Sequence, residues 1–141
     1  MLDCRQIGEK RHESSCCCPL CDQHPESINH LLVSYVFTRV FWYTMLRRFG
    51  LHSLAPQPDA TSFLDWWEIS SDIVPRMIKK GLNSLIILGA WMVWKHRNRV
   101  VFDGATPDFT LLLRSAEEER HKWQLAGAKG LSFLVAPMSN V

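Results

Sequence analysis

Apolar residues recur at helical spacing in two long stretches of this 141-residue chain. In the first, from Glu26 or Ser27 to Phe49, they stand three, four or seven positions apart, as on one face of an α-helix. The members of this stripe are Ile28, Leu32, Tyr35, Trp42, Leu46 and Phe49. Arg39 interrupts the stripe, and Gly50 is a stop signal at its end. The pattern predicts one long helix over residues 26–49.

The second stretch begins at Ser71 or Asp72, ends at about Arg99, and is expected to be the central helix. Its apolar face is a stripe formed by Ile78, Leu82, Leu85, Gly89 and Met92. Three more residues widen this stripe, namely Ile86, Ala90 and Trp94. A glycine within a helix costs about 1 kcal/mol relative to alanine. Gly89 therefore predicts that another helix, the one over 26–49, approaches closely there.

Two shorter helices complete the pattern. Thr61 or Ser62 can cap a helix over residues 63–69, after a loop that contains prolines. The run Thr106-Pro107-Asp108 combines a cap, a proline and an acid, which is typical of a helix start. That helix is expected to reach about Ala126 and stop at Gly127, with Leu112, Ala116 and Trp123 on its inward side.

Length and composition fit a single domain. With 141 residues, 47% of them hydrophobic, and six tryptophans, the chain can bury one modest core. We expect an all-α fold, a small helical domain over residues 1–130 whose helical body covers 26–127, followed by a loose tail over 131–141. The most apolar run, Leu85 to Trp94, is half the length of a membrane span, so no membrane partner is expected. The net charge of +2 does not by itself demand a nucleic-acid partner.

The cysteines are concentrated near the start of the chain. Four of the five lie within residues 16–21. Neighbouring cysteines do not easily join distant parts of a fold, so they indicate thiol or metal chemistry in a reducing compartment. The first residues also lack the apolar run of a signal peptide. We therefore expect an intracellular protein, of the nucleus or cytoplasm, that is not secreted.

The run Cys18-Pro19-Leu20-Cys21, followed by His30, has the spacing of zinc ligands, because thiolates and imidazole suit this metal. The fourth ligand is expected three to five residues beyond the histidine. Position 35 satisfies that spacing, but it is Tyr35, and a neutral phenol with a pKa near 10 is a poor ligand. Besides water, the candidate substitutes are Cys16, Cys17 and His24. The sequence predicts at most one zinc site over residues 16–35, either kept by a substitute ligand or decayed to free thiols.

Helix geometry bears on this site. In an unbroken α-helix, side chains five residues apart point about 140° away from each other. His30 and position 35 could share a metal only if the helix begins near His30 or is distorted there. Without a metal, Tyr35 is expected to be a packed core aromatic.

A second candidate site lies near the end of the central helix. Its members are Trp91, Trp94, Lys95, His96, Arg97 and Arg99. Because cations bind phosphates and tryptophans can stack on bases, Lys95, Arg97 and Arg99 are candidate nucleic-acid contacts. In the alternative interpretation, the cations stabilise the negative end of the helix dipole and the tryptophans belong to the core.

Enzymatic residues are not evident. The aspartates are scattered, with no adjacent pair that could hold two metal ions, and there is no glycine-rich phosphate loop. Cys18 or Cys21 with His30 could be written as a nucleophile and base, but four clustered thiols fit a metal better. We expect no enzyme and no small-molecule substrate.

Three groups of residues together resemble a known family. They are Cys18-Pro-Leu-Cys21 with Glu26, His30-Leu-Leu32 and Phe37-x-Arg39-x-x-Trp42; Trp91-x-x-Trp94-Lys95-x-Arg97-Asn98-x-x-Val101-Phe102; and Trp123-x-x-Ala126-Gly127-Ala128. In this order, the three groups resemble the motifs of the zinc-binding domain at the C-terminal end of non-LTR (LINE-type) retrotransposon reverse transcriptases of the plant type. The resemblance covers roughly Asp3 to Leu134, and the family has cysteine where this chain has Tyr35.

The resemblance implies a non-catalytic, zinc-binding appendage that holds RNA or DNA near a polymerase, here as a stand-alone or degenerate fragment. The alternative from another class is a metal-free helical scaffold or protein-interaction domain, whose tryptophan-rich surface meets another protein.

Overall fold

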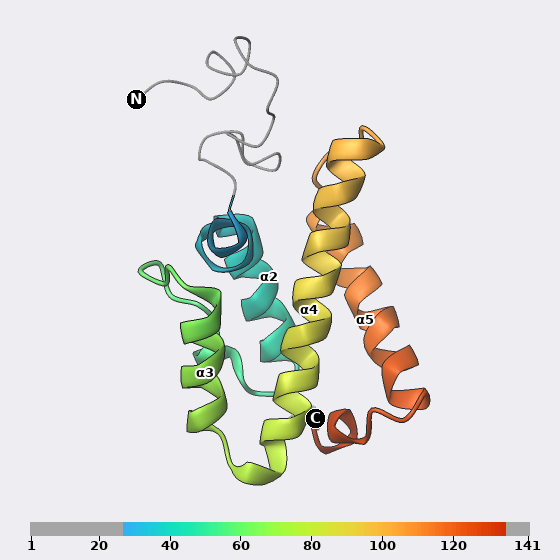
Figure 1. Ribbon diagram of the computed structural model, residues 1–141. Coiled ribbons are helices and arrows are strands. Elements are labelled where there is room, and N and C mark those ends of the chain that lie inside the picture. Colours follow the sequence, from blue (N-terminus) through green and yellow to red (C-terminus); the bar gives the residue numbers. More distant parts are fainter. Residues whose placement is uncertain (1–26, 135–141) are drawn as a thin grey trace.

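The computed structural model describes residues 27–134 of the chain, and every regular element within them is helical. The predicted all-α fold is therefore confirmed. The α-helices are α2 (Val36–Arg47), α3 (Phe63–Ile73), α4 (Arg76–Phe102) and α5 (Phe109–Leu125). Shorter helical turns, of π type in the first case and 3₁₀ type in the others, are η2 (His30–Ser34), η3 (His52–Leu54) and η4 (Lys129–Phe133). The long helix α4 lies between α3 and α5, as Figure 1 shows.

The helix predicted over 26–49 is broken at Tyr35, so this prediction was wrong. The N–H of Tyr35 donates to the carbonyl oxygen of His30 (2.8 Å), which closes a π turn, and the Tyr35 backbone is extended (φ −69°, ψ 127°). The indole Nε1 of Trp42 donates to the carbonyl oxygen of Leu32 at 2.8 Å. A continuous α-helix would offer that oxygen to the N–H of Val36. The side chain of Trp42 thus uses an oxygen that the backbone ladder would need.

The break changes which residues of the first stripe are buried. Ile28, predicted to face the core, is 55% exposed, while Trp42 and Leu46 are fully buried as predicted. The buried face of α2 consists of Thr38, Phe41, Trp42, Met45 and Leu46. Extended backbone at Tyr35 resets the helical phase, and two residues absent from the predicted stripe, Phe41 and Met45, enter the core.

Helix α4 is the central element, as predicted. It packs against α3, α5, η2 and η4, and its buried side chains include Leu82, Leu85, Ile86, Leu88 and Val93. The predicted close approach at Gly89 is confirmed: a Cβ atom there would lie 2.5 Å from two carbons of the Trp42 ring. Glycine is needed because a larger residue would collide with that indole.

The boundaries of α3 and α4 differ from those predicted. The Ser62 hydroxyl caps α3 by accepting from the N–H of Asp65 (3.2 Å), but the helix continues to Ile73 rather than ending at residue 69. The next helix begins at Arg76, not at residue 71 or 72. Val74 is extended (ψ 156°) because a residue that precedes a proline avoids the α conformation.

The start and end of the last long helix were predicted only in part. Asp108, not Thr106, caps α5, since its Oδ1 accepts from the N–H of Leu111 at 3.0 Å. Leu112 and Ala116 face inward as predicted, and Gly127 adopts a left-handed conformation (φ 114°) just after the helix.

The loose tail predicted from residue 131 was wrong for residues 131–134. Leu131 and Leu134 are buried, and η4 packs on the first half of α4. A Cβ atom on Gly81 would overlap the carbonyl oxygen of Gly130, so the two backbones touch there. This segment completes the core.

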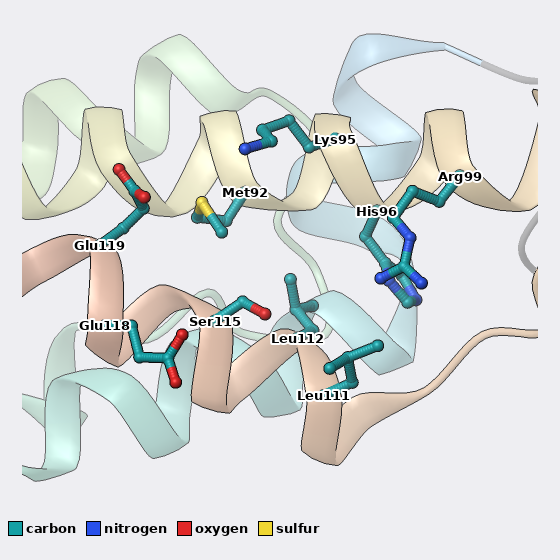
Figure 2. Close-up of a pocket in the computed structure, with 9 residues that line it drawn as sticks. All are labelled: Met92, Lys95, His96, Arg99, Leu111, Leu112, Ser115, Glu118 and Glu119. Carbon is teal, nitrogen blue, oxygen red and sulfur yellow. The ribbon is translucent and has the colours of Figure 1, made fainter.

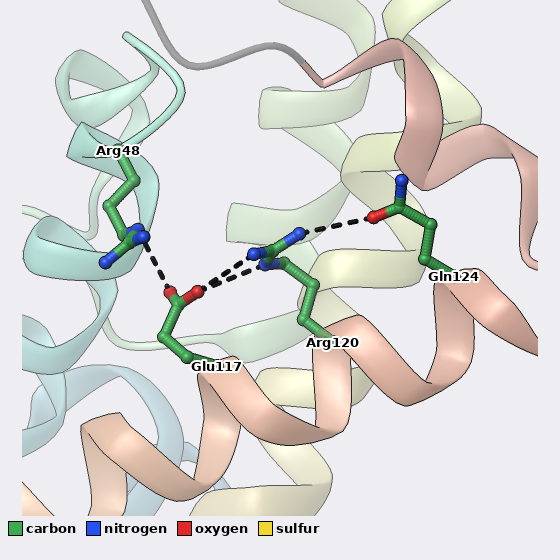
Figure 3. Close-up of polar contacts among 4 residues, drawn as sticks. All are labelled: Arg48, Glu117, Arg120 and Gln124. Atoms are coloured by element: carbon green, nitrogen blue, oxygen red, sulfur yellow. Dashed lines mark hydrogen bonds and ion pairs between the residues drawn. The ribbon is translucent and has the colours of Figure 1, made fainter.

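Polar side chains join the end of α2 to α5, as Figure 3 shows. Glu117 accepts from Arg48 (Nε–Oε2 3.4 Å) and from Arg120 (Nη2–Oε1 3.1 Å), and Arg120 also bonds the Oε1 of Gln124 at 3.3 Å. The Arg48 side chain is 55% exposed, so its pair with Glu117 is worth about 1 kcal/mol or less. Within residues 27–134, no helix is both long and apolar enough to cross a membrane.

Candidate functional site

His30 and Tyr35, five residues apart, lie side by side. Their ring centroids are 5.7 Å apart with an angle of 34° between the planes. Two features of the backbone cause this: the π turn that contains His30 and the extended conformation of Tyr35. The distortion that a shared metal would require is therefore present. A cysteine at position 35 would have its Cβ atom on the same side of the chain as the present tyrosine ring.

Tyr35 is also part of a layer of aromatic rings. It stacks on Phe37 (centroids 5.4 Å apart, planes at 8°), and Phe37 stacks on His96 (5.7 Å, 11°). Phe109 meets Phe37 edge-on at 5.7 Å. Tyr35 is half-buried and packs against the core, as expected of an aromatic residue at this position in the absence of a metal. The layer connects the turn at His30 to the region where α4 and α5 meet.

Of the predicted zinc ligands, His30 alone lies within the described residues. The others, Cys18 and Cys21 with their candidate substitutes Cys16, Cys17 and His24, lie outside residues 27–134. Within that range, no three side chains of His, Cys, Asp or Glu are grouped so that they could hold a metal ion. The donor chemistry fits zinc at His30, whose imidazole is half-buried, and does not fit it at Tyr35, because the phenol is a poor ligand.

The cations predicted to contact nucleic acid do not form one patch. The Arg97 guanidinium lies 4.9 Å from the ring centroid of half-buried Trp94, and both line a cavity beside Ser27 and Ile28. Lys95 and Arg99 line a different cavity, between α4 and α5, which Figure 2 shows. Lys95 also places its Nζ 6.0 Å from the ring centroid of Trp91, which is 50% exposed.

His96 has a structural role that the sequence reasoning missed. It is only 4% exposed, and its Nε2 accepts a hydrogen bond from the N–H of Asp108 (3.1 Å). Burial, together with the nearby Arg99 guanidinium, lowers the pKa of the imidazole, and Asp108 opposes this in part. His96 stands four residues after Met92 and seven after Gly89, so the apolar periodicity of α4 already marked it as a core position.

A third cavity, of about 300 Å³, lies between α3 and the loop before it and is more apolar than the one between α4 and α5. Its lining includes Leu54, Ala55, Trp66, Ile69 and Ile73. It contains none of the predicted site residues.

No protein-family model, curated protein or solved structure matches this chain.

Proposed function

We propose that this chain is a non-catalytic module that binds one zinc ion and single-stranded nucleic acid. This is the role implied by its resemblance to the zinc-binding domain of non-LTR retrotransposon reverse transcriptases. The observation that carries the proposal is the helix break at Tyr35. The break puts position 35 next to His30, although the residue now at position 35 is a poor ligand.

The zinc ligands in this proposal are Cys18, Cys21 and His30, with a fourth from Cys16, Cys17 or His24. A zinc ion at these ligands would be structural, because four protein ligands leave no open position for a substrate. The proposal does not rely on Tyr35 as a ligand. Its aromatic stacking on Phe37 explains how a non-ligand can occupy position 35 without opening the fold.

The nucleic-acid contacts in this proposal are Lys95, Arg97 and Arg99, with the exposed face of Trp91 as a stacking surface. Trp91 and Lys95 lie together on the outside of α4, which suits a base with its neighbouring phosphate. Arg97 lies beside Ser27 and Ile28, shortly before the candidate ligand His30 in the sequence. Because Arg97 lines one cavity while Lys95 and Arg99 line another, a flexible single strand fits the three cations better than a rigid duplex.

One observation favours a second candidate, a metal-free helical scaffold or protein-interaction domain. The core of residues 27–134 is closed by its own side chains, including Trp42 and the aromatic layer at Tyr35. Such a core can persist without zinc. In this alternative, the cysteines are remnants and the exposed tryptophan surface of α4 meets another protein.

The zinc proposal is tested by native mass spectrometry of the full chain, purified under reducing conditions. We expect one zinc per chain and, in Tyr35→Cys, an affinity at least about ten-fold higher, because the new thiolate has the spacing expected of the fourth ligand and replaces the substitute ligand. The matched control is Tyr43→Cys, which adds a thiol at the other, exposed tyrosine and should leave the affinity unchanged. A chain without zinc, whose Tyr35→Cys variant also binds none, would contradict the proposal and support the scaffold.

The nucleic-acid proposal is tested by fluorescence anisotropy with a labelled 20-nucleotide single strand at several salt concentrations. Binding should weaken as salt rises, and Arg97→Gln should reduce the log–log salt slope by about 0.7, the effect of one lost phosphate contact. Arg76→Gln, at the opposite end of α4, is the control and should leave the slope unchanged. Equal slopes for both variants, or no retention at low salt, would contradict the proposal.

A further inference from the structure

The cavity between the second half of α4 and the first half of α5 shares Lys95 and Arg99 with the proposed nucleic-acid contacts, but its other lining residues, among them Met92, Leu112 and Glu118, have no part in the proposed function. Its volume is about 220 Å³, below the roughly 300–1,000 Å³ of pockets that hold drug-sized ligands. Its floor is made of the buried side chains of Met92, His96 and Leu112. The cavity therefore suits a small ligand with an apolar part.

The charges around this cavity are separated by helix. Figure 2 shows that the cations, Lys95 and Arg99, come from α4, whereas the carboxylates, Glu118 and Glu119, come from α5. Packed helices have axes about 8–10 Å apart. A ligand lying between them thus meets positive charge on one side and negative charge on the other.

These opposite charges do not neutralise each other across the cavity. Among residues 27–134, none of the ion pairs includes Lys95, Arg99 or Glu118. Glu119 pairs with Lys122 on its own helix (Oε2–Nζ 3.7 Å), not with a cation of α4. A purely anionic ligand would be repelled by the carboxylates, and a purely cationic one by Lys95 and Arg99. A ligand that carries both charges satisfies both sides.

We propose that this cavity binds a small zwitterion with an apolar side chain, namely a free apolar α-amino acid. Its carboxylate contacts Lys95 and Arg99 of α4, and its ammonium group contacts Glu118 and Glu119 of α5. The apolar side chain covers Met92 and Leu112 on the floor. The site binds a ligand and transforms nothing, and it uses none of the proposed zinc ligands.

His96 limits the polar chemistry of the floor. Its Nε2 lone pair accepts from the N–H of Asp108, so the imidazole is neutral and holds its proton on Nδ1. The floor therefore contributes no charge of its own. The rim alone orients the two charged groups of the ligand.

Four probes test the proposal by isothermal titration calorimetry of the full chain. L-Leucine is expected to bind. N-acetyl-L-leucine lacks the ammonium group, L-leucinamide lacks the carboxylate, and glycine lacks the apolar side chain. Each of these three should bind at least about ten-fold more weakly, since each loses a charged contact or the apolar burial. Absence of leucine binding, or equal binding of any one of the three matched probes, would overturn the proposal.

Two variants identify the site. Arg99→Gln and Glu118→Gln each remove one charge from an exposed rim side chain, so helicity should be unchanged by circular dichroism. Both should weaken leucine binding at least about ten-fold. The control Arg76→Gln removes an exposed charge at the far end of α4 and should bind leucine like the parent chain. Unchanged binding by Arg99→Gln or Glu118→Gln would overturn this assignment, whatever the zinc experiment shows.

Discussion

The two halves of α4 have different surroundings, although they are one continuous helix. The first half, residues 76–89, packs against α3, against η4 and, at Gly89, against the Trp42 indole, while Met77 and Ile87 on its outer face are exposed. Within this half, the Oδ1 of Asn83 accepts two hydrogen bonds from α3, one from the Nε1 of Trp67 (2.8 Å) and one from the hydroxyl of Ser71 (2.7 Å). The second half, residues 90–102, buries Met92, Val93 and His96 but exposes the large side chains of Trp91, Val101 and Phe102.

This difference separates the closed part of the core from the residues of the proposed binding sites. Truncating a buried side chain next to the first half is expected to open a cavity in the core. The second half contains the exposed Trp91, the cations Lys95, Arg97 and Arg99, and one wall of the charged cavity of Figure 2. The same helix can thus hold the fold at one end and present functional groups at the other.

The largest change in stability is expected between two matched substitutions of tryptophan by alanine. Trp42→Ala should lower the free energy of unfolding by about 3–5 kcal/mol, because Trp42 is fully buried against Gly89. Trp91→Ala, at a half-exposed position of the second half, should change it by about 0.5 kcal/mol or less. Denaturant unfolding followed by circular dichroism measures both. Comparable losses of unfolding free energy in the two variants would show that the two halves of α4 contribute alike to stability.

A smaller effect is expected from overpacking at the contact between α2 and α4. Gly89→Leu should destabilise the chain by about 1–3 kcal/mol, because even its Cβ atom would collide with the Trp42 ring. The control is Val101→Leu, which also enlarges a residue of α4 but at a position 40% exposed, and should be near neutral. An unchanged melting temperature for Gly89→Leu would show that this contact is open in solution.

The smallest effect concerns pH and the second half of α4. Since burial lowers the pKa of His96, the folded chain binds fewer protons there than the unfolded chain. Stability from this group is complete above the ordinary histidine pKa of about 6.5 and declines as pH falls below it. Protonation would also replace the acceptor that the Asp108 N–H uses, while Arg99 and Asp108 face the ring with opposite signs.

The variant His96→Gln keeps an acceptor and cannot titrate in this range. Unfolding free energies measured between pH 5 and 7 should fall more steeply with acid in the parent chain than in this variant. Other histidines contribute equally to both chains, so the difference reports His96. Identical slopes would mean that His96 is not held neutral by the fold.

The sequence predicted which residues belong to the candidate zinc site, but not the backbone conformation that brings position 35 next to His30. Spacing pointed to His30 and position 35, and helix geometry stated the condition for them to meet. Whether that condition holds depended on the carbonyl oxygen of Leu32, which Trp42 takes from ten residues away. Cys18 and Cys21 lie outside the described residues, so their part in the site stays a prediction. The division of Lys95, Arg97 and Arg99 between two cavities likewise depended on what packs beside α4.

The sequence by itself determined the helical class, the central helix, and local signals such as a helix cap at Thr61 or Ser62 and the helix stop at Gly127. These are encoded by neighbours a few residues apart, through periodicity, capping oxygens and glycine's freedom at positive φ. Only the tertiary structure decided the break at Tyr35, the hydrogen bond between His96 and Asp108, and the docking of Leu131 onto α4. Each of these depends on a partner ten or more residues away, because folding brings together groups whose separation along the chain leaves no local pattern.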